Sequence, residues 1–254
     1  MKNYNQVFQR YELKYILTRK QYENIKQDLL EYMKVDKYGI STIQSIYYDT
    51  PSSLIIRNSL EKPTFKEKIR LRSYGLATET STCYLEIKRK AQGLVYKRRI
   101  PILEKNAKDF FNYKGMLQDT QIAKELTYFR NYYKELYPAI LIIYERESFY
   151  KENSEVRVTF DFNPRYRTQN VNLHTSLEGN PIVDNDVVLM EIKVLHNMPL
   201  WLTKIITKNG ARRGSISKYG RAYKIEKEKK LTAGGNIVCL NQSLKANLVL
   251  HHSC

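Results

Sequence analysis

Lys68-Ile69-Arg70-Leu71-Arg72 alternates basic and apolar residues one by one. Successive side chains of a β-strand point to opposite faces, so this stretch predicts a strand with one cationic face and one apolar face. The same two-residue spacing of charge recurs in Glu12-Leu13-Lys14, Glu86-Ile87-Lys88, Glu191-Ile192-Lys193, Lys97-Arg98-Arg99 and Arg157-Val158-Thr159. Several strands, far apart in the chain, are therefore each predicted to have one charged face, and the fold prediction rests on this pattern.

Runs of this kind predict eight strands, separated by stretches with the apolar spacing of helices. The expected strands are 8–17, 43–49, 65–74, 83–90, 94–102, 139–150, 156–162 and 187–195. The first expected helix begins at a capping box of Thr18 and Gln21, and the others cover 51–58, 107–117, 120–137, 199–210 and 217–224. This order indicates an α+β protein with one domain at 1–226 and a tail of different composition at 227–254.

The charged faces have two interpretations. An antiparallel sheet with one solvated face produces the same alternation. However, the charged positions are mostly Arg, Lys or Glu, and the opposite positions are strongly apolar, as helices packed on them would require. We therefore expect an eight-stranded antiparallel β-barrel with helices packed outside and the charged faces turned inward, a size of barrel that can enclose one small ligand.

A bore lined by cations is unfavourable when it is empty, because two like charges about 6 Å apart repel by about 3 kcal/mol at an effective dielectric near 20. A linear polyanion would offset this repulsion, with Arg donating paired hydrogen bonds to phosphate and Lys acting as a point charge. A carboxylate among these cations suits Mg²⁺ or Mn²⁺, which take oxygen ligands and bridge phosphates. No Gly-rich phosphate loop of the G-x-x-x-x-G-K-[ST] type occurs, so side chains would have to bind the anion.

The overall composition agrees with an anionic ligand. The 254 residues carry 43 Lys and Arg against 26 Asp and Glu, a formal net charge of +17. The longest apolar stretch, residues 139–143, is far shorter than the ~20 residues that cross a bilayer, and no secretory signal is visible. Three cysteines are too few for a disulfide framework. We expect a cytoplasmic protein without a transmembrane segment.

Several short motifs occur in a characteristic order along residues 8–224. They are Arg10-Tyr11-Glu12-Leu13-Lys14, Ser45-Ile46-Tyr47-Tyr48-Asp49-Thr50, Lys68-Ile69-Arg70-Leu71-Arg72-Ser73-Tyr74-Gly75, Leu85-Glu86-Ile87-Lys88, Tyr144-Glu145-Arg146, Val156-Arg157-Val158, Met190-Glu191-Ile192-Lys193 and Ser215-Ile216-Ser217-Lys218-Tyr219. In combination they resemble the VTC-type polyphosphate polymerase domain, a branch of the CYTH-like triphosphate tunnel metalloenzymes.

This resemblance implies a tunnel in which ATP donates its γ-phosphoryl group to a growing polyphosphate chain, with Mn²⁺ or Mg²⁺ as cofactor. The implied partners are ATP and polyphosphate or pyrophosphate, not DNA, and a membrane partner would be a separate chain. The implied phosphate-binding residues are Lys14, Arg70, Arg72, Lys88, Lys97, Arg146, Arg157, Lys193 and Lys218; of these, Arg70, Arg72, Lys88 and Lys218 are the catalytic candidates. Glu191 and Glu12 are the implied metal ligands. Catalysis would be positioning and charge neutralisation.

Two departures from the family pattern bear on the activity. Hydrolytic members of the superfamily typically begin with Glu-x-Glu-x-Lys, whereas Arg10 stands at the first Glu position and favours the polymerase. Polymerases often carry a second Lys where Ser215 stands, with Arg212 or Arg213 as candidate substitutes. An inorganic or nucleoside triphosphatase on the same fold and a non-catalytic polyphosphate- or RNA-binding module remain the alternatives.

Overall fold

The computed structural model describes residues 11–92, 94–214 and 216–233 of the 254-residue chain. These segments contain ten strands and six helices, and none of the helices combines the length and apolarity needed to cross a membrane. The strands are β1 (Tyr11–Thr18), β2 (Lys34–Asp49), β3 (Phe65–Tyr74), β4 (Thr82–Ala91), β5 (Leu94–Leu103), β6 (Tyr137–Tyr150), β7 (Arg157–Arg167), β8 (Asn180–Pro181), β9 (Val187–Val194) and β10 (Arg212–Arg213). The helices are α1 (Arg19–Leu30), α2 (Leu54–Leu60), α3 (Glu104–Phe111), α4 (Gln121–Tyr133), α5 (Leu200–Lys208) and α6 (Lys218–Ala233).

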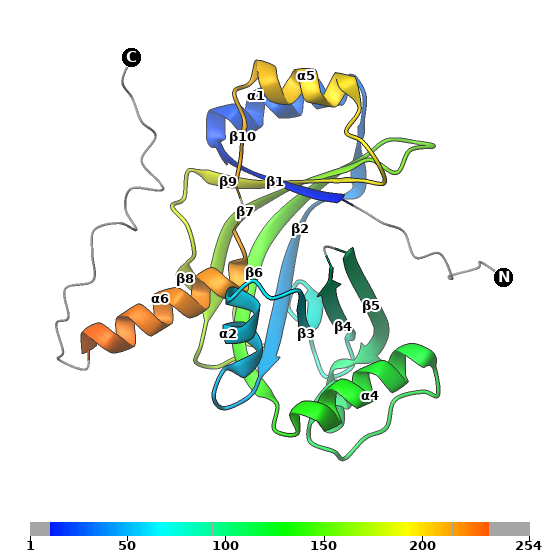
Figure 1. Ribbon diagram of the computed structural model, residues 1–254, viewed down its shortest axis with the longest axis vertical. Helices are drawn as coiled ribbons and strands as arrows, with labels where there is room; N and C mark the ends of the chain where they lie inside the picture. The colour runs from blue at the N-terminus through cyan, green and yellow to red at the C-terminus, as the bar shows by residue number, and fades with distance from the viewer. Residues whose placement is uncertain (1–10, 93, 215, 234–254) are drawn as a thin grey trace.

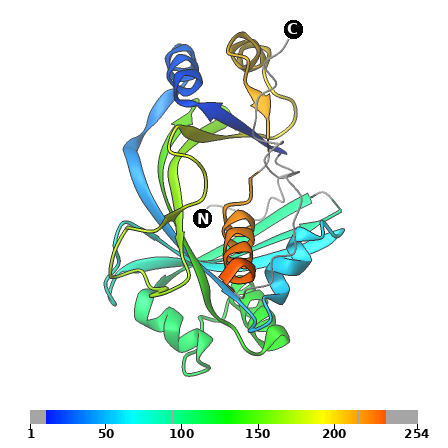
Figure 2. The ribbon, with the colours of Figure 1, turned by 90° about the vertical axis from the view of Figure 1, so that its left-hand side faces the viewer.

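The strands form one antiparallel sheet in the order β10-β1-β9-β7-β6-β2-β3-β4-β5, with β8 paired to β7. The sheet curls, so that β1 and β9 lie above β3, β4 and β5 (Figures 1 and 2). The register sets Arg70 opposite Glu86 and Lys14 opposite Glu191. Charged residues of neighbouring strands therefore lie side by side on the concave face, and the eight long strands match the eight that the alternation predicts.

The expected closed barrel is not observed. Between the described strands, no ladder joins the β1–β10 end of the sheet to the β5 end. Irregularities in the ladders, at Val35/Ile40 in β2 and at Ile143/Glu145 in β6, bend and twist the long strands. A side-chain contact links the two ends instead, with Lys88 Nζ 2.9 Å from Glu12 Oε2. The charged face is thus enclosed by a strongly curved open sheet.

Four helices cover the convex, apolar face, as expected. α1 and α5 lie side by side and pack on β1, β7 and β9 through a core that includes Ile25 and Phe160 (Figure 1). α3 and α4 pack on β3, β4 and β5 through a second core that includes Leu71 and Phe129. Because burial of these apolar faces is the main stabilising contribution, the charged faces are left to line the concave side.

The other two helices, α2 and α6, lie on the concave side, which corrects the expectation that all helices pack outside. Ile56 of α2 and Tyr219 of α6 form a third core with Ile140 of β6. Tyr47 of β2 stacks on Tyr219, with the ring centroids 4.5 Å apart. α6 therefore covers part of the concave face and brings its first residue, Lys218, to the charged residues of the sheet (Figure 2).

Most element boundaries differ from the sequence-based prediction by a few residues; α3, for example, covers Glu104–Phe111 rather than 107–117, and three extensions are notable. β2 begins at Lys34 rather than at residue 43, because an irregular stretch between its two ladder segments hides the alternation. β7 continues to Arg167, past Asn163 with its positive φ. α6 continues to Ala233, through the expected domain end at 226. Residues 8–10 of the first expected strand and 234–254 of the expected tail lie outside the described residues.

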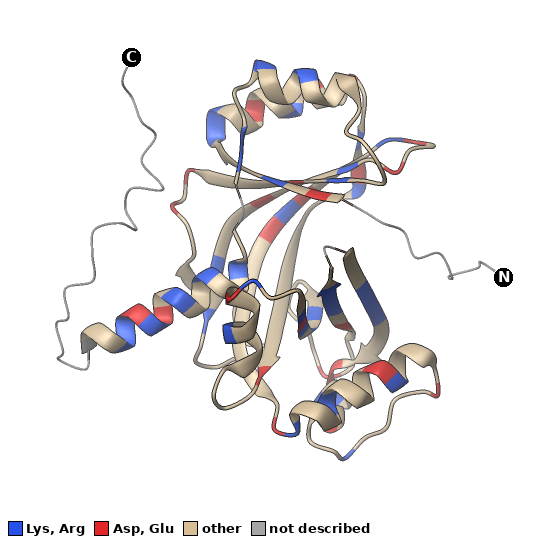
Figure 3. Cartoon of the chain, viewed as in Figure 1, with Lys and Arg blue, Asp and Glu red and all other residues tan. Residues whose placement is uncertain are grey.

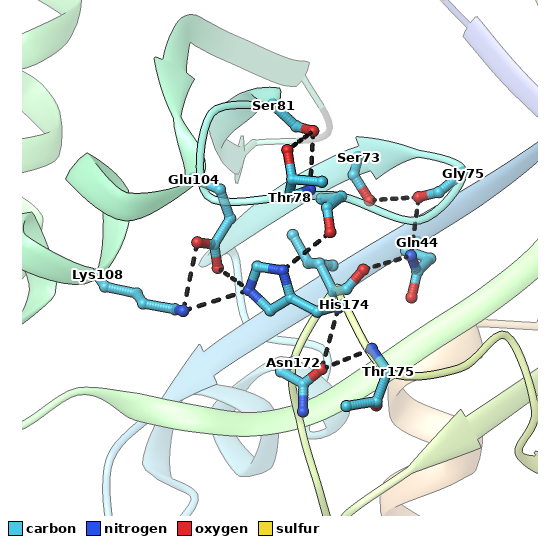
Figure 4. A network of polar contacts seen from close by, with 12 residues as sticks. Gln44, Ser73, Gly75, Thr78, Ser81, Glu104, Lys108, Asn172, His174 and Thr175 are labelled. Atoms are coloured by element: carbon cyan, nitrogen blue, oxygen red, sulfur yellow. Dashed lines mark hydrogen bonds and ion pairs between the residues drawn. The ribbon is translucent and has the colours of Figure 1, made fainter.

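A polar network joins the turn after β3 to α3 and to the loop before β8 (Figure 4). His174 Nδ1 lies 2.9 Å from Ala77 O, and His174 Nε2 lies 3.0 Å from Glu104 Oε1. Gln44 Nε2 donates a hydrogen bond to Gly75 O at 2.8 Å. These contacts fix the turn from two sides, away from the charged face.

Candidate functional site

The concave face holds a cavity of about 790 Å³. Its walls come from eight strands of the sheet and from α2 and α6, and Lys and Arg residues mark β4, β5 and the start of α6 (Figure 3). The cations that line it are Lys14, Lys66, Lys68, Arg70, Arg72, Lys88, Lys90, Lys97, Arg146, Lys193, Arg213 and Lys218. The acids that line it are Glu12, Glu67 and Glu191. Twelve cations against three acids favour a ligand that carries several negative charges.

Eight of the nine expected phosphate-binding residues line this cavity, including all four catalytic candidates, and so do both metal candidates. The exception is Arg157. It is the first residue of β7, is exposed, and lies opposite Lys193 in the ladder. Arg157 shares the charged face, but it lies four residues before Asp161 on β7, and this position at the end of the strand leaves it outside the cavity lining.

Glu86 on β4 is the counter-ion of the cations on β3 and β5. It is 1% exposed, and its Oε2 lies 2.6 Å from Arg70 Nη2 while its Oε1 lies 2.9 Å from Lys97 Nζ. Arg72 Nη2 is 3.9 Å from Oε2. Burial alone would raise the pKa of Glu86, but Arg70, Arg72 and Lys97 hold this pKa well below its usual range. The carboxylate therefore stays charged and orients the three cations.

Asp161 on β7 has the same role at another wall of the cavity. Arg146 Nε and Nη2 donate to its two carboxylate oxygens at 2.5 and 2.8 Å, and Lys218 Nζ forms a further ion pair with Oδ2. Burial would raise the pKa of Asp161, but Arg146 and Lys218 lower it to about 2. Because Lys218 belongs to α6, this ion pair also fixes the start of the helix against the sheet.

Four amines that line the cavity, those of Lys14, Lys66, Lys68 and Lys97, have lowered pKa values, and the shifts of Lys68 and Lys97 are large. Burial, together with Lys66 and against the effect of Tyr47, lowers the pKa of Lys68 to about 8. Burial, together with Arg70 and against the effect of Glu86, lowers the pKa of Lys97 to about 7. An anion in the cavity would favour the charged form of both amines, so binding an anion should be accompanied by proton uptake.

Tyr47 and Tyr144 are two of the three tyrosines in the described lining, and both contact its cations. Tyr47 Oη accepts a hydrogen bond from Arg70 Nη1 at 2.9 Å. Burial alone would raise the pKa of Tyr47, but Arg70 and the neighbouring Lys68 lower it to about 8. Arg146 Cζ and Lys218 Nζ lie 5.2 and 4.5 Å from the ring centroid of Tyr144, within the range of cation–π contacts. Both rings thus pack against the cations that face the ligand space.

The cavity offers mainly positive charge. Its described lining contains neither Cys nor His, and its acids lie next to cations. Phosphoryl transfer needs little more than positioning and neutralisation of the charge on the phosphoryl oxygens, because the attacking oxygen can belong to a substrate. The arrangement therefore suits chemistry between bound phosphates.

A comparison with protein families agrees with this geometry. The model of the VTC domain family matches residues 9–227. The chain belongs to the VTC domain family. The resemblance seen in the sequence motifs is therefore confirmed over the whole stretch that carries them. A search of curated proteins finds no match.

Solved structures resemble this VTC domain at low sequence identity. A Bacillus halodurans protein provisionally named an adenylate cyclase has a TM-score of 0.51 and 8% identity, over 84% of this chain and 94% of that chain. A Vibrio parahaemolyticus protein with the same provisional name has a TM-score of 0.48 and 12% identity, over 86% and 99%. A Pyrococcus horikoshii protein has a TM-score of 0.45 and 14% identity, over 85% and 99%. The Bacillus structure supports the fold alone.

The two metal candidates of the VTC domain, Glu12 and Glu191, lie diagonally on the paired strands β1 and β9, opposite Lys193 and Lys14. Each already has an amine 2.9 Å away, Lys88 for Glu12 and Lys193 for Glu191. In the part of the chain that the structure describes, no three His, Cys, Asp or Glu side chains are grouped to hold a metal ion. A Mg²⁺ or Mn²⁺ ion at Glu191 would therefore need most of its oxygen ligands from outside the protein, from a bound phosphate and from water.

Arg212 and Arg213, the two candidate substitutes for the second Lys of the family, differ in position. Arg213 lines the cavity, where its strand pairs with Tyr15 of β1, whereas Arg212 is not among the described lining residues. Of the two candidate substitutes, Arg213 is the one that could contact a ligand. Ser215 itself and Arg10, on which the distinction from hydrolases depends, lie outside the described residues.

Several residues of the site were not among the sequence-based candidates: the lining cations Lys66, Lys68 and Lys90, the lining tyrosines Tyr47 and Tyr144, and the buried acids Glu86 and Asp161. A signal existed for all of them, because each lies an even number of residues from a candidate or another charged position on its own strand. Lys68 is two residues before Arg70, and Glu86 is two residues before Lys88. Counting along each strand in steps of two would have placed them on the charged face.

Proposed function

We propose that this VTC domain is an ATP-dependent polyphosphate polymerase that transfers the ATP γ-phosphoryl group to the end of a polyphosphate chain. The observation that carries the proposal is the convergence of twelve Lys and Arg side chains from separate strands and α6 on one cavity. Glu86 and Asp161, buried behind these cations, keep them oriented. Membership of the VTC family supports the same activity.

In the proposed reaction, a terminal phosphate oxygen of the chain attacks the γ-phosphorus of ATP. A new P–O bond forms while the bond to the β,γ-bridging oxygen breaks, and ADP leaves with that electron pair. Arg70 and Arg72 on one wall and Arg146 on another would neutralise the charge on the transferred group, since the paired donors of Arg fit phosphate oxygens. Lys14 and Lys88 would hold the neighbouring phosphates as point charges.

A bound Mg²⁺ or Mn²⁺ ion would supply further neutralisation of the phosphate charge. Glu191 would hold it, since burial would raise the pKa of this carboxyl but Lys193 and Lys14 keep the pKa well below its usual range. Glu12 would orient Lys88 instead, through the contact at 2.9 Å. Under this proposal the protein binds ATP and polyphosphate or pyrophosphate, and it acts in the cytoplasm, where ATP is present.

Incubation of the full chain with ATP and Mn²⁺, followed by gel analysis of phosphate chain length, tests the proposal. We expect ADP and long phosphate chains. Orthophosphate without polymer would assign a triphosphatase instead and overturn the polymerase. Salt-dependent binding of polyphosphate without any turnover would assign a binding module and would overturn it as well.

The site is tested with a double variant and a matched control. Arg70→Ala with Arg72→Ala should abolish polymer formation and sharply reduce the rise in Tm that tripolyphosphate causes by binding the folded state. Arg157→Ala is the control, because this Arg lies on the charged face but is exposed and outside the cavity lining. Equal effects of the two changes would contradict the assigned site even if the protein makes polymer.

A further inference from the structure

The charged face of the β3–β4 ladder changes character along its length. The opposed residues are Lys66 and Lys90, then Lys68 and Lys88, then Arg70 and Glu86, and finally Arg72 and Tyr84. Burial and the neighbouring lysines lower the pKa of Lys66, as expected where several cations crowd together. One end of the ladder therefore suits a run of phosphates, while the other end joins a cation to an aromatic ring.

Beyond Arg72, three flat side chains gather on this face. By the alternation of their strands, Tyr74, Tyr84 and Arg99 share the face of Arg72. The rings of Tyr74 and Tyr84 meet edge to face, with centroids 6.0 Å apart, and Arg99 Cζ lies 5.0 Å from the centroid of Tyr84. Tyr74 is still 52% exposed, and Arg99 is exposed as well. Aromatic rings and guanidinium planes of this kind are the groups on which nucleobases stack.

The position of Tyr74 is fixed by the turn that follows it. Gly75 has a φ of +73°, and its N–H donates a hydrogen bond to Thr42 O at 2.9 Å. Its carbonyl accepts hydrogen bonds from Gln44 Nε2 at 2.8 Å and from Ser73 Oγ at 3.0 Å (Figure 4). An exposed ring next to a turn held in this way is preorganised, which lowers the entropic cost of binding a ligand.

We propose that the base of the nucleotide substrate stacks on Tyr74 and Arg99, over Tyr84, with its α-phosphate next to Arg72. This inference rests on the proposed function, because it takes the phosphoryl donor to be a nucleoside triphosphate. Tyr74, Tyr84 and Arg99 are not among the described residues that line the cavity, so the base would lie beyond Arg72, and the phosphate chain would extend from Arg72 into the cavity toward the lysine end of the ladder. Stacking tolerates different bases, so ATP and GTP should bind with similar affinity.

The test compares the affinities of ATP and tripolyphosphate for the full chain by calorimetry at one salt concentration. Tyr74→Leu with Tyr84→Leu should weaken ATP binding by about tenfold, the usual scale for the loss of a stacked base, and leave tripolyphosphate binding within about twofold. Tyr74→Phe with Tyr84→Phe keeps both rings and should preserve the affinity for ATP. Tyr96→Leu is the matched control, since Tyr96 lies opposite Arg89 on the other face of the ladder.

Each outcome decides the inference. An equal loss of affinity for both ligands would mean that the tyrosines act on the phosphates or on folding, and an unchanged affinity for ATP would mean that the base lies elsewhere; either result overturns the inference. Failure of tripolyphosphate to bind the unaltered protein would instead overturn the proposed function. As a second readout, stacking should quench the fluorescence of 2-aminopurine riboside triphosphate in the unaltered protein and in the Phe variant, but not in the Leu variant.

Discussion

Replacing Glu86 by Gln removes one negative charge from the centre of the cationic cluster while keeping the size of the side chain. At 2.6 Å, the attraction between Glu86 and Arg70 is about 6 kcal/mol at an effective dielectric of 20, before the cost of taking both groups out of water is subtracted. Removing one partner of a buried ion pair usually costs about 3–5 kcal/mol net. Because Gln still accepts one hydrogen bond, we expect Glu86→Gln to lower the free energy of unfolding by about 3 kcal/mol.

Thermal unfolding of the unliganded protein measures this loss. In a chain of this size, 1 kcal/mol shifts Tm by about 2–4 °C, so Tm should fall by about 6–12 °C. Tripolyphosphate should reverse most of the fall, since its oxygens replace the missing carboxylate beside Arg70 and Lys97. For the same reason, the Kd of tripolyphosphate should be lower for the variant than for the unaltered protein.

Glu145→Gln is the matched control for this experiment. Glu145 is paired with Arg165 at 2.7 Å and is not among the described residues that line the cavity. This change should lower Tm without any gain in affinity for tripolyphosphate. A Tm of Glu86→Gln within about 2 °C of the unaltered protein, or a weaker affinity for tripolyphosphate, would refute the assignment of Glu86 as the counter-ion.

Three further outcomes are expected. Tripolyphosphate binding should take up protons near pH 8, because the pKa values of Lys97 and Lys68 are lowered to about 7 and about 8 without ligand, and calorimetry in two buffers of different ionisation enthalpy measures this uptake. Zero proton uptake on binding would contradict the assignment. Without ligand, the folded protein holds fewer protons on these two amines than the unfolded chain does, so Tm should rise between about pH 7 and pH 10. The lowered pKa of Asp161, about 2, means that the unaltered protein loses about 2 kcal/mol of stability as the pH falls from about 4 to about 2. Asp161→Asn should remove this pH-dependent loss, as measured by acid unfolding. His174→Ala should lower the free energy of unfolding by about 1–3 kcal/mol by removing a partner of buried Glu104, with polymer formation unchanged at a temperature where the variant is folded.

The strands and their charged face could be predicted because both depend on a period of two along the chain. β3 illustrates this, since its observed bounds, Phe65–Tyr74, are those predicted from the alternation. Closure of the sheet could not be predicted in the same way. It depends on ladder irregularities, such as the one between Val35 and Ile40, that change the curvature of long strands and have no simple sequence signature.

The charged face and its residues could be predicted from their spacing, but the role of Glu86 and Asp161 as counter-ions could not. Glu86 acts as a counter-ion because β5 places Lys97 beside it, and Asp161 does so because α6 carries Lys218 to it from 57 positions along the chain. Such roles depend on which strands become neighbours. The packing of α2 and α6 on the concave side was also missed, because Tyr219 forms part of an apolar core there and still donates a hydrogen bond to Asp49 at 2.6 Å.

The ion pair between Lys88 and Glu12 has a consequence for how a long polymer is handled. A ring of strands closed by backbone hydrogen bonds would admit a chain only through its ends, so a long product would have to slide out along its whole length. Here the two side chains are 42% and 21% exposed, and ion pairs of this exposure contribute only about 0–1 kcal/mol. Parting them breaks no ladder between the described strands, so under the proposed function a lateral seam would let a finished polymer leave sideways and would let an existing one be taken up from its middle.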